Sequence, residues 1–282
     1  MDPLDSSSFA RDSQFQRLLC HEQSIDLTVA ALEIARDFQP ETNFGHVQSW
    51  IRTQAQAVRP EILRTANPDD GLKVLCRFMT ETLGFHGCPE DRCLPEGSFL
   101  PSVIDRRSGL PITLSILYMA IAEQVGIGLQ GVSSPQHFLC RSDDSPAGPL
   151  FIDPFHAGRM QTQAECLCWL KELTGPSVAR IKPALRVASA RTIIERLLNN
   201  LRNLFLCQKN WKGLQVVQHR LALLNPCSYI ARRDLAFATM QSGRPGAAID
   251  MFEECLAEAP EQDRPAVTHL IDEAHRLVAR WN

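Results

Sequence analysis

No apolar stretch in this sequence is long enough to cross a lipid bilayer. The longest uncharged apolar run, Leu114 to Ala122, which includes a serine and a tyrosine, falls well short of the roughly 20 residues that a transmembrane helix needs. The N-terminus carries neither the basic region nor the apolar region of a secretory signal peptide. We therefore expect a cytoplasmic protein whose ten cysteines remain reduced thiols.

A strong charge imbalance is also missing. The formal net charge is −3 and the pI is about 6.2, which gives no electrostatic argument for binding nucleic acid or an anionic membrane. The cysteines are scattered, and the pairs Cys88/Cys93 and Cys166/Cys168 do not form two zinc knuckles. We expect most of them to be small core residues, with no cofactor and no metal, although Cys88 and Cys93 together with a histidine remain an open alternative.

The first third of the chain has helical periodicity. Residues 1–20 are polar and are expected to form a loose tail or a frayed helix. Residues 21–95 are predicted to form a helical segment of three helices that pack on one another. These helices begin at Ser24, at His46 and at Asn67, where Asn67 caps the helix and Pro68 occupies its first turn.

A central core is predicted over residues 96–176. Pro111 precedes a helix, Ile112 to Val125, that is apolar on nearly every side, as is typical of a fully surrounded helix. Three strands and a closing helix are predicted to follow: Leu129–Ser133, His137–Arg141, Leu150–Asp153 and Thr162–Leu173. Residues 178–188 are expected to be a linker.

Residues 189–282 are helical again and contain an internal repeat. Leu201 and Leu235 are separated by one period of about 34 residues, as are Pro226 and Pro260. That period predicts two tetratricopeptide-like repeats followed by a last helix. Because two repeats bury little surface by themselves, we expect them to dock on the core.

His137 and Asp153 have the residue types and the order of a proton relay. A histidine on one strand can transfer a proton to or from a nucleophile, and an aspartate on the next strand can orient the imidazole. In such a site a cysteine at the start of a buried helix gains thiolate character from the helix dipole. The signal is weak by itself, because a lone histidine on a strand is more often a structural residue and an aspartate before a proline often only starts a turn.

Four motifs resemble the SirB-type transglutaminase-like family: Gly84-Phe-His-Gly, Arg106-Arg-Ser-Gly-Leu-Pro-Ile-Thr-Leu-Ser, Gly131-Val-Ser-Ser-Pro-Gln-His-Phe-Leu and Phe151-Ile-Asp-Pro-Phe-His-Ala-Gly-Arg. The resemblance implies a bacterial protein with a papain-like α+β core and tetratricopeptide-like repeats. It also implies that His137 and Asp153 correspond to the transglutaminase histidine and aspartate. Gln136 stands where that family usually has glycine.

The nucleophile implied by the resemblance falls near Pro111 to Thr113, where this sequence has no cysteine. A thiol borrowed from Cys88 or Cys140 is one alternative, although strand alternation directs Cys140 away from the face of His137. An alcohol, Thr113 or Ser115, is a second alternative. The third is a catalytically inert site that serves as a binding or structural core.

Two further ligand-binding possibilities are open. Arg106 and Arg107 have the charge to clamp an anion near the start of the central helix, but a surface pair bonded to Asp105 or to loop carbonyls is the favoured explanation. His156 and His137 are a possible pair of metal ligands for which the sequence offers no evident third member.

These observations favour an α+β fold with a papain/transglutaminase-like core, an N-terminal helical segment and C-terminal tetratricopeptide-like α-helical repeats. The favoured function is a non-catalytic one in protein–protein interaction or regulation, with a protein or peptide partner bound through the repeats. The alternative is a hydrolase or acyltransferase that uses His137 and Asp153 with Thr113, Ser115 or a relocated cysteine. The sequence leaves the oligomeric state open.

Overall fold

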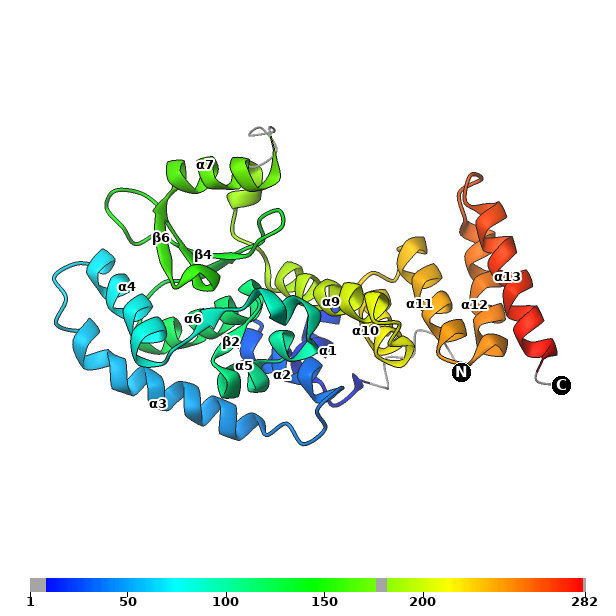
Figure 1. Cartoon of the computed structure of the whole chain (residues 1–282), viewed down its shortest axis with the longest axis horizontal. Helices are drawn as coiled ribbons and strands as arrows, with labels where there is room; N and C mark the ends of the chain where they lie inside the picture. Colours follow the sequence, from blue (N-terminus) through cyan, green and yellow to red (C-terminus); the bar gives the residue numbers. More distant parts are fainter. Residues whose placement is uncertain (1–8, 176–181, 281–282) are drawn as a thin grey trace. The chain divides into compact units, whose positions relative to one another are not determined.

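The computed structural model describes residues 9–175 and 182–280. They divide into two compact units. One comprises Gln23–Leu197, and the other combines the described residues before Gln23 with those after Leu197. The helices expected as a separate N-terminal segment belong to the same unit as the sheet. The elements of both units are labelled in Figure 1.

The first helices of the larger unit begin at side-chain caps. The helix α2 (Leu27–Arg36) is capped by Asp26, which accepts a hydrogen bond from Val29 N at 3.0 Å, rather than by Ser24 as predicted. The helix α3 (Phe44–Ile62) starts earlier than predicted. The start of α4 (Pro68–Arg77) is confirmed, with Asn67 as cap and Pro68 in the first turn. A π-helix, η2 (Phe78–Thr82), continues α4.

The central helix is confirmed. The helix α6 runs over Pro111–Val125 and ends at Gly126, whose φ of 82° is the left-handed conformation that glycine adopts at helix ends. Nearly all of its side chains are buried, because it contacts α2, α3, the short helix α5 (Leu100–Arg106) and strands of the sheet. In Figure 1 it lies between the long helix α3 and the strands. It forms the middle layer on which the candidate site rests.

The main sheet has four antiparallel strands in sequential order. They are β3 (Gln130–Val132), β4 (Leu139–Ser142), β5 (Leu150–Asp153) and β6 (Arg159–Thr162). The three predicted strands are present, but His137 precedes β4 instead of starting it. The strand β6 was not predicted, because its one buried residue is polar (Gln161) and it lacks an apolar alternation.

Short elements complete this unit. A two-residue parallel pair joins β1 (His86–Gly87) to β2 (Ser108–Gly109), and neither strand was predicted. The closing helix α7 (Gln163–Thr174) begins with a capping box in which Thr162 and Glu165 satisfy each other's backbone N–H groups. Part of the predicted linker, residues 178–181, lies outside the described residues. The 3-10 helix Lys182–Leu185 (η6) follows, with Leu185 buried.

The second unit is helical in its described part. It contains α1 (Ser13–Leu19), the end of α9 (Ala190–Cys207), α10 (Trp211–Leu224), α11 (Tyr229–Gln241), α12 (Pro245–Glu258) and α13 (Arg264–Ala279). From α10 onward, consecutive helices pack on each other. The tetratricopeptide-like character of this array stays a prediction. None of the described helices is both long and apolar enough to span a membrane.

Residues 1–20 were expected to form a loose tail or a frayed helix, and their described part contains the helix α1, which is packed rather than frayed. Phe15 and Leu18 of α1 are buried, and α1 packs against α10. Arg220 of α10, fully buried, forms an ion pair with Asp12 and lies 4.0 Å from the ring centroid of Phe9. The N-terminal segment is therefore part of the core of this unit.

Candidate functional site

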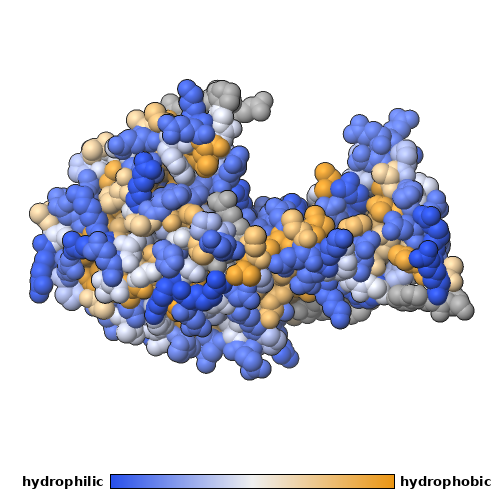
Figure 2. Space-filling view, viewed as in Figure 1, coloured by the Kyte–Doolittle hydropathy of each residue, from blue (hydrophilic) through white to orange (hydrophobic). Residues whose placement is uncertain are grey.

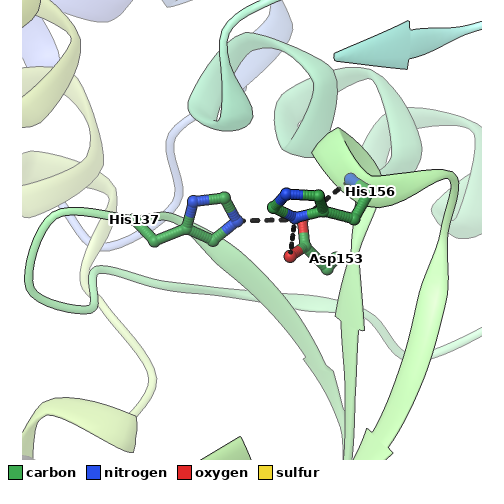
Figure 3. A group of neighbouring side chains, drawn as sticks. All are labelled: His137, Asp153 and His156. Carbon is green, nitrogen blue, oxygen red and sulfur yellow. Dashed lines mark hydrogen bonds and ion pairs between the residues drawn. The ribbon is translucent and has the colours of Figure 1, made fainter. Parts of the chain in front are cut away.

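The structure brings His137 and Asp153 together. His137 Nε2 lies 2.9 Å from Asp153 Oδ1, and both side chains are almost fully buried. The pairing of β4 with β5 explains this proximity, because His137 leads into β4 and Asp153 is the last residue of β5. Figure 3 shows the two side chains facing each other at the end of these strands. The geometry fits the relay expected from the sequence, while its catalytic role stays a prediction.

A tight turn positions His137. His137 N donates a hydrogen bond to Ser134 O at 3.3 Å, and Ser134 Oγ donates to His137 O at 3.0 Å. Gln136, the third residue of this turn, has a φ of 58°, in the left-handed region that favours glycine. Its side chain is exposed to solvent. The histidine is thus held by a turn that carries backbone strain at Gln136.

Asp153 accepts hydrogen bonds on both carboxylate oxygens. Besides His137, Oδ1 accepts from Phe155 N at 3.1 Å and from His156 N at 3.2 Å. Burial alone acts to raise the pKa of Asp153, but hydrogen bonds and charge attraction from His137 and His156 outweigh burial and leave that pKa below its usual value. Asp153 is therefore a charged group that organises the site.

His156 is the third member of this cluster. Its Nδ1 lies 2.7 Å from Asp153 Oδ2, and its ring stacks on that of His137 with centroids 5.6 Å apart. About half of the His156 side chain is exposed. His156 and His137 were a possible pair of metal ligands in the sequence, where no third ligand was evident. Asp153 is that residue, and one ligand atom from each of the three lies within 4.8 Å of the others.

Aromatic rings enclose the buried histidine. Trp169 of α7 meets the His137 ring edge to face at 5.0 Å, and Phe155 does so at 6.0 Å. Trp169 also contacts His156, at 6.1 Å. Sequence reasoning missed Trp169, since nothing in the pattern of α7 distinguishes it from an ordinary packing residue. These rings restrict the access of water to the imidazole of His137.

The predicted alcohol nucleophiles are fully buried on α6. The hydroxyls of Thr113 and Ser115 have no hydrogen-bond partner among the described residues. The backbone oxygen of Ser115 accepts a weak hydrogen bond from Cys140 Sγ at 3.7 Å. The structure therefore places both hydroxyls in the protein interior, away from bulk solvent.

None of the buried cysteines described in this unit has an activated thiol. Burial raises the pKa of Cys140 to about 12, and it does the same for Cys76 and Cys166. A thiol with such a pKa has almost no thiolate at neutral pH. Cys88, the other cysteine considered, donates to Glu90 Oε2 at 2.9 Å in the connector after β1.

The two arginines before α6 differ in their surroundings. Arg106 is exposed. Arg107 ends α5 with a φ of 59°, and its guanidinium lies 5.1 Å from the ring centroids of both Trp50 and Phe85. This cation–π arrangement gives Arg107 a structural role in the described structure. Anion binding by the pair stays a prediction.

The family model described as "Transglutaminase-like superfamily" matches residues 45–199, more than half of the chain and the whole of the His137–Asp153–His156 cluster. The chain belongs to the transglutaminase-like superfamily. This confirms the broad resemblance seen in the sequence motifs, while the narrower SirB-type assignment stays a prediction.

Relatives of this superfamily member include proteins named UPF0162. One from Xylella fastidiosa is 30% identical over 236 residues, covering 82% of this chain and 83% of the relative. One from Vibrio cholerae is 26% identical over 196 residues, covering 68% and 72%. F-box only protein 21 of Homo sapiens is 32% identical over 113 residues, covering 38% of this chain and 17% of that protein. No solved structure matches the chain.

Proposed function

We propose that this chain is a non-catalytic transglutaminase-fold protein. The observation that carries the proposal is the chemistry at the start of α6, where the superfamily fold would present its nucleophile. That position holds Thr113, whose hydroxyl is fully buried. The buried thiol of Cys140, which contacts the backbone oxygen of Ser115, has its pKa raised to about 12. A relay of His137 and Asp153 without an activated nucleophile cannot start acyl transfer. Its remaining role is to hold the sheet, α6 and α7 together.

The proposed activity is the binding of a protein or peptide partner by helices α9–α13. Figure 2 shows a largely hydrophilic face that apolar side chains interrupt. Two large apolar side chains of the helical unit are among the exposed ones, Leu206 on α9 at 46% and Ile230 on α11 at 56%. Exposed apolar side chains on a helical array supply the contact area that partner binding uses.

A second function has one observation in its favour. Nδ1 of His137 forms no hydrogen bond to any described residue. A catalytic histidine needs such a nitrogen to accept a proton from a nucleophile or a substrate. The corresponding enzyme is a hydrolase or acyltransferase in which Thr113, Ser115 or a relocated cysteine attacks. Such an enzyme needs a movement that exposes a buried hydroxyl.

Labelling with electrophilic probes separates the two functions. A fluorophosphonate reports reactive hydroxyls and iodoacetamide reports reactive thiols, each applied to the wild type and to His137→Ala. We expect no labelling that depends on His137, and a lower thermal stability for His137→Ala. Labelling of Thr113, Ser115 or one cysteine that His137→Ala abolishes would refute the non-catalytic proposal.

Point variants test the binding surface without dividing the chain. Leu206→Asp and Ile230→Asp place a charge on the helical unit, whereas Leu63→Asp places one at an equally apolar position, 71% exposed, in the other unit. A cross-linked partner that the wild type and Leu63→Asp capture should be lost from the first two variants. Retention by all variants, or capture by none of the proteins, contradicts partner binding by α9–α13.

A further inference from the structure

Three side chains with metal-binding atoms converge at the end of the sheet. His137 leads into β4, Asp153 ends β5, and His156 ends the single turn of 3-10 helix Pro154–His156 (η5) that follows. Their ligand atoms lie within 4.8 Å of one another, and no other group of three such residues in the described part of the chain comes as close. In Figure 3 the two imidazoles approach the same carboxylate from two sides.

From this convergence we propose that His137, Asp153 and His156 form a binding site for a divalent transition-metal ion, with zinc as the best-matched ion. Two imidazole nitrogens and one carboxylate oxygen are the protein ligands of many zinc sites that keep an open fourth position. Magnesium and calcium prefer sites made of oxygen atoms alone, so this donor set disfavours both.

The ligand atoms lie within 4.8 Å of one another and would adjust their separations to bind one ion. Ligand atoms on one tetrahedral zinc ion lie about 3.4 Å apart, since each is about 2.0–2.1 Å from the metal. Each imidazole already has a nitrogen 2.9 Å (His137) or 2.7 Å (His156) from a carboxylate oxygen of Asp153. An ion bound to both rings and to the carboxylate would replace the two protons that bridge them. Each ring would then carry its proton on its other nitrogen, which bonds to no described residue.

The surroundings of Asp153 prepare it to act as a ligand. The backbone N–H groups of Phe155 and His156 both donate to Oδ1, which fixes the carboxylate orientation. Oδ2 accepts only from His156 among the described residues, so it is the oxygen left to face an ion. Such outer hydrogen bonds typically orient the ligands of metal sites.

The exposure of the three side chains to solvent also suits a metal site. His156 is half exposed, so an ion can enter from its side and a water molecule or ligand can take the fourth position. His137 and Asp153 are almost fully buried. Trp169 and Phe155 border the His137 ring, which gives the site one apolar wall.

Cobalt(II) binding to the full-length, chelator-treated protein tests the proposal, because the absorption of Co²⁺ distinguishes nitrogen and oxygen ligands from thiolates. We expect one equivalent to bind with ligand-field bands and without a thiolate charge-transfer band, and Zn²⁺ to displace it. His156→Ala should weaken binding at least about tenfold, judged by the sensitivity of metal sites to changes around the ligands. Because His156 is exposed, this variant should keep the wild-type circular dichroism spectrum.

His86→Ala is the matched control. His86 is also exposed, and its Nδ1 contacts Gly84 O rather than a carboxylate. This variant should bind Co²⁺ as the wild type does. The proposal is overturned if the wild type binds no Co²⁺, if binding survives in His156→Ala, if His86→Ala loses it equally, or if thiolate bands dominate. Metal binding is independent of the probe labelling above, so either result can stand without the other.

Discussion

Replacing Asp153 by asparagine tests the physical account of the site. The carboxylate accepts four hydrogen bonds, from the rings of His137 and His156 and from two backbone N–H groups. Asparagine has nearly the same shape and keeps one oxygen in the position of Oδ1. It loses the negative charge, and it presents an amide N–H₂ to His156, whose half-exposed ring can change tautomer to accept from it.

The expected loss of stability follows from those four bonds. A hydrogen bond to a charged group contributes about 1.5–3 kcal/mol, and one between neutral groups about 0.5–1.5 kcal/mol. Each retained bond therefore weakens by about 1 kcal/mol. Because the bonds share one carboxylate, these losses of stability do not add fully. We expect Asp153→Asn to lower the free energy of unfolding by about 2–4 kcal/mol at pH 7, consistent with these bond strengths.

The loss should depend on pH with a defined sign. The pKa of Asp153 in the folded protein is lowered from 3.8, so its carboxylate stabilises the fold fully above the unfolded-state pKa. That contribution disappears as the pH falls through the lowered folded-state pKa. The difference between the wild type and Asp153→Asn should therefore be largest at neutral pH and shrink below about pH 4, near the pKa of an unfolded aspartate.

Urea denaturation followed by circular dichroism at several pH values measures this difference. Asp105→Asn removes the same charge at an exposed position and serves as the control, with a change within about 0.5 kcal/mol, as for most surface substitutions. Equal midpoints for the two variants at pH 7 would refute the assigned role of the carboxylate. If the loss of stability in Asp153→Asn stays constant down to pH 3, that loss does not have an electrostatic origin.

Three further substitutions probe other parts of the fold. Arg220→Met removes the cation that forms an ion pair with the buried carboxylate of Asp12, and should cost about 3–5 kcal/mol in urea denaturation. Gln136→Gly relieves a φ of 58°, a strain of about 1–2 kcal/mol that glycine's greater unfolded-state entropy offsets in part, so the melting temperature should rise slightly. Gly87→Ala would place a Cβ 2.3 Å from the Phe155 ring and should cost about 1–3 kcal/mol in thermal unfolding.

Each of the three has a clear contrary outcome. If the double variant Asp12→Asn/Arg220→Met loses as much free energy of unfolding as the single variants Asp12→Asn and Arg220→Met lose together, the pair is not coupled. A lower melting temperature for Gln136→Gly would mean that its side chain contributes more than its backbone costs. Gly246→Ala is the control for Gly87→Ala, because its Cβ would meet no atom within 4 Å, and an equal loss in both contradicts the steric account.

The sequence by itself determined the elements whose signals are local. Pro111 and Gly126 delimit the central helix because one suits a first helical turn and the other a left-handed end. Asn67 capped its helix as predicted, and β5 matched its predicted bounds. The order of the strands was enough to expect His137 beside Asp153. The strand β6 was missed because its pairing with β5, rather than any pattern of its own, makes it a strand.

Only the tertiary structure decided which distant side chains share an environment. Asp12 and Arg220 are 208 positions apart in the chain, and no periodicity links them. Likewise, Trp169 meets the two histidines only because α7 packs on β5 and β6. Asp153 binds both imidazoles at once because the turn after β5 returns His156 to the same carboxylate. Such contacts depend on how the elements pack, and local sequence patterns predict the elements but not their packing.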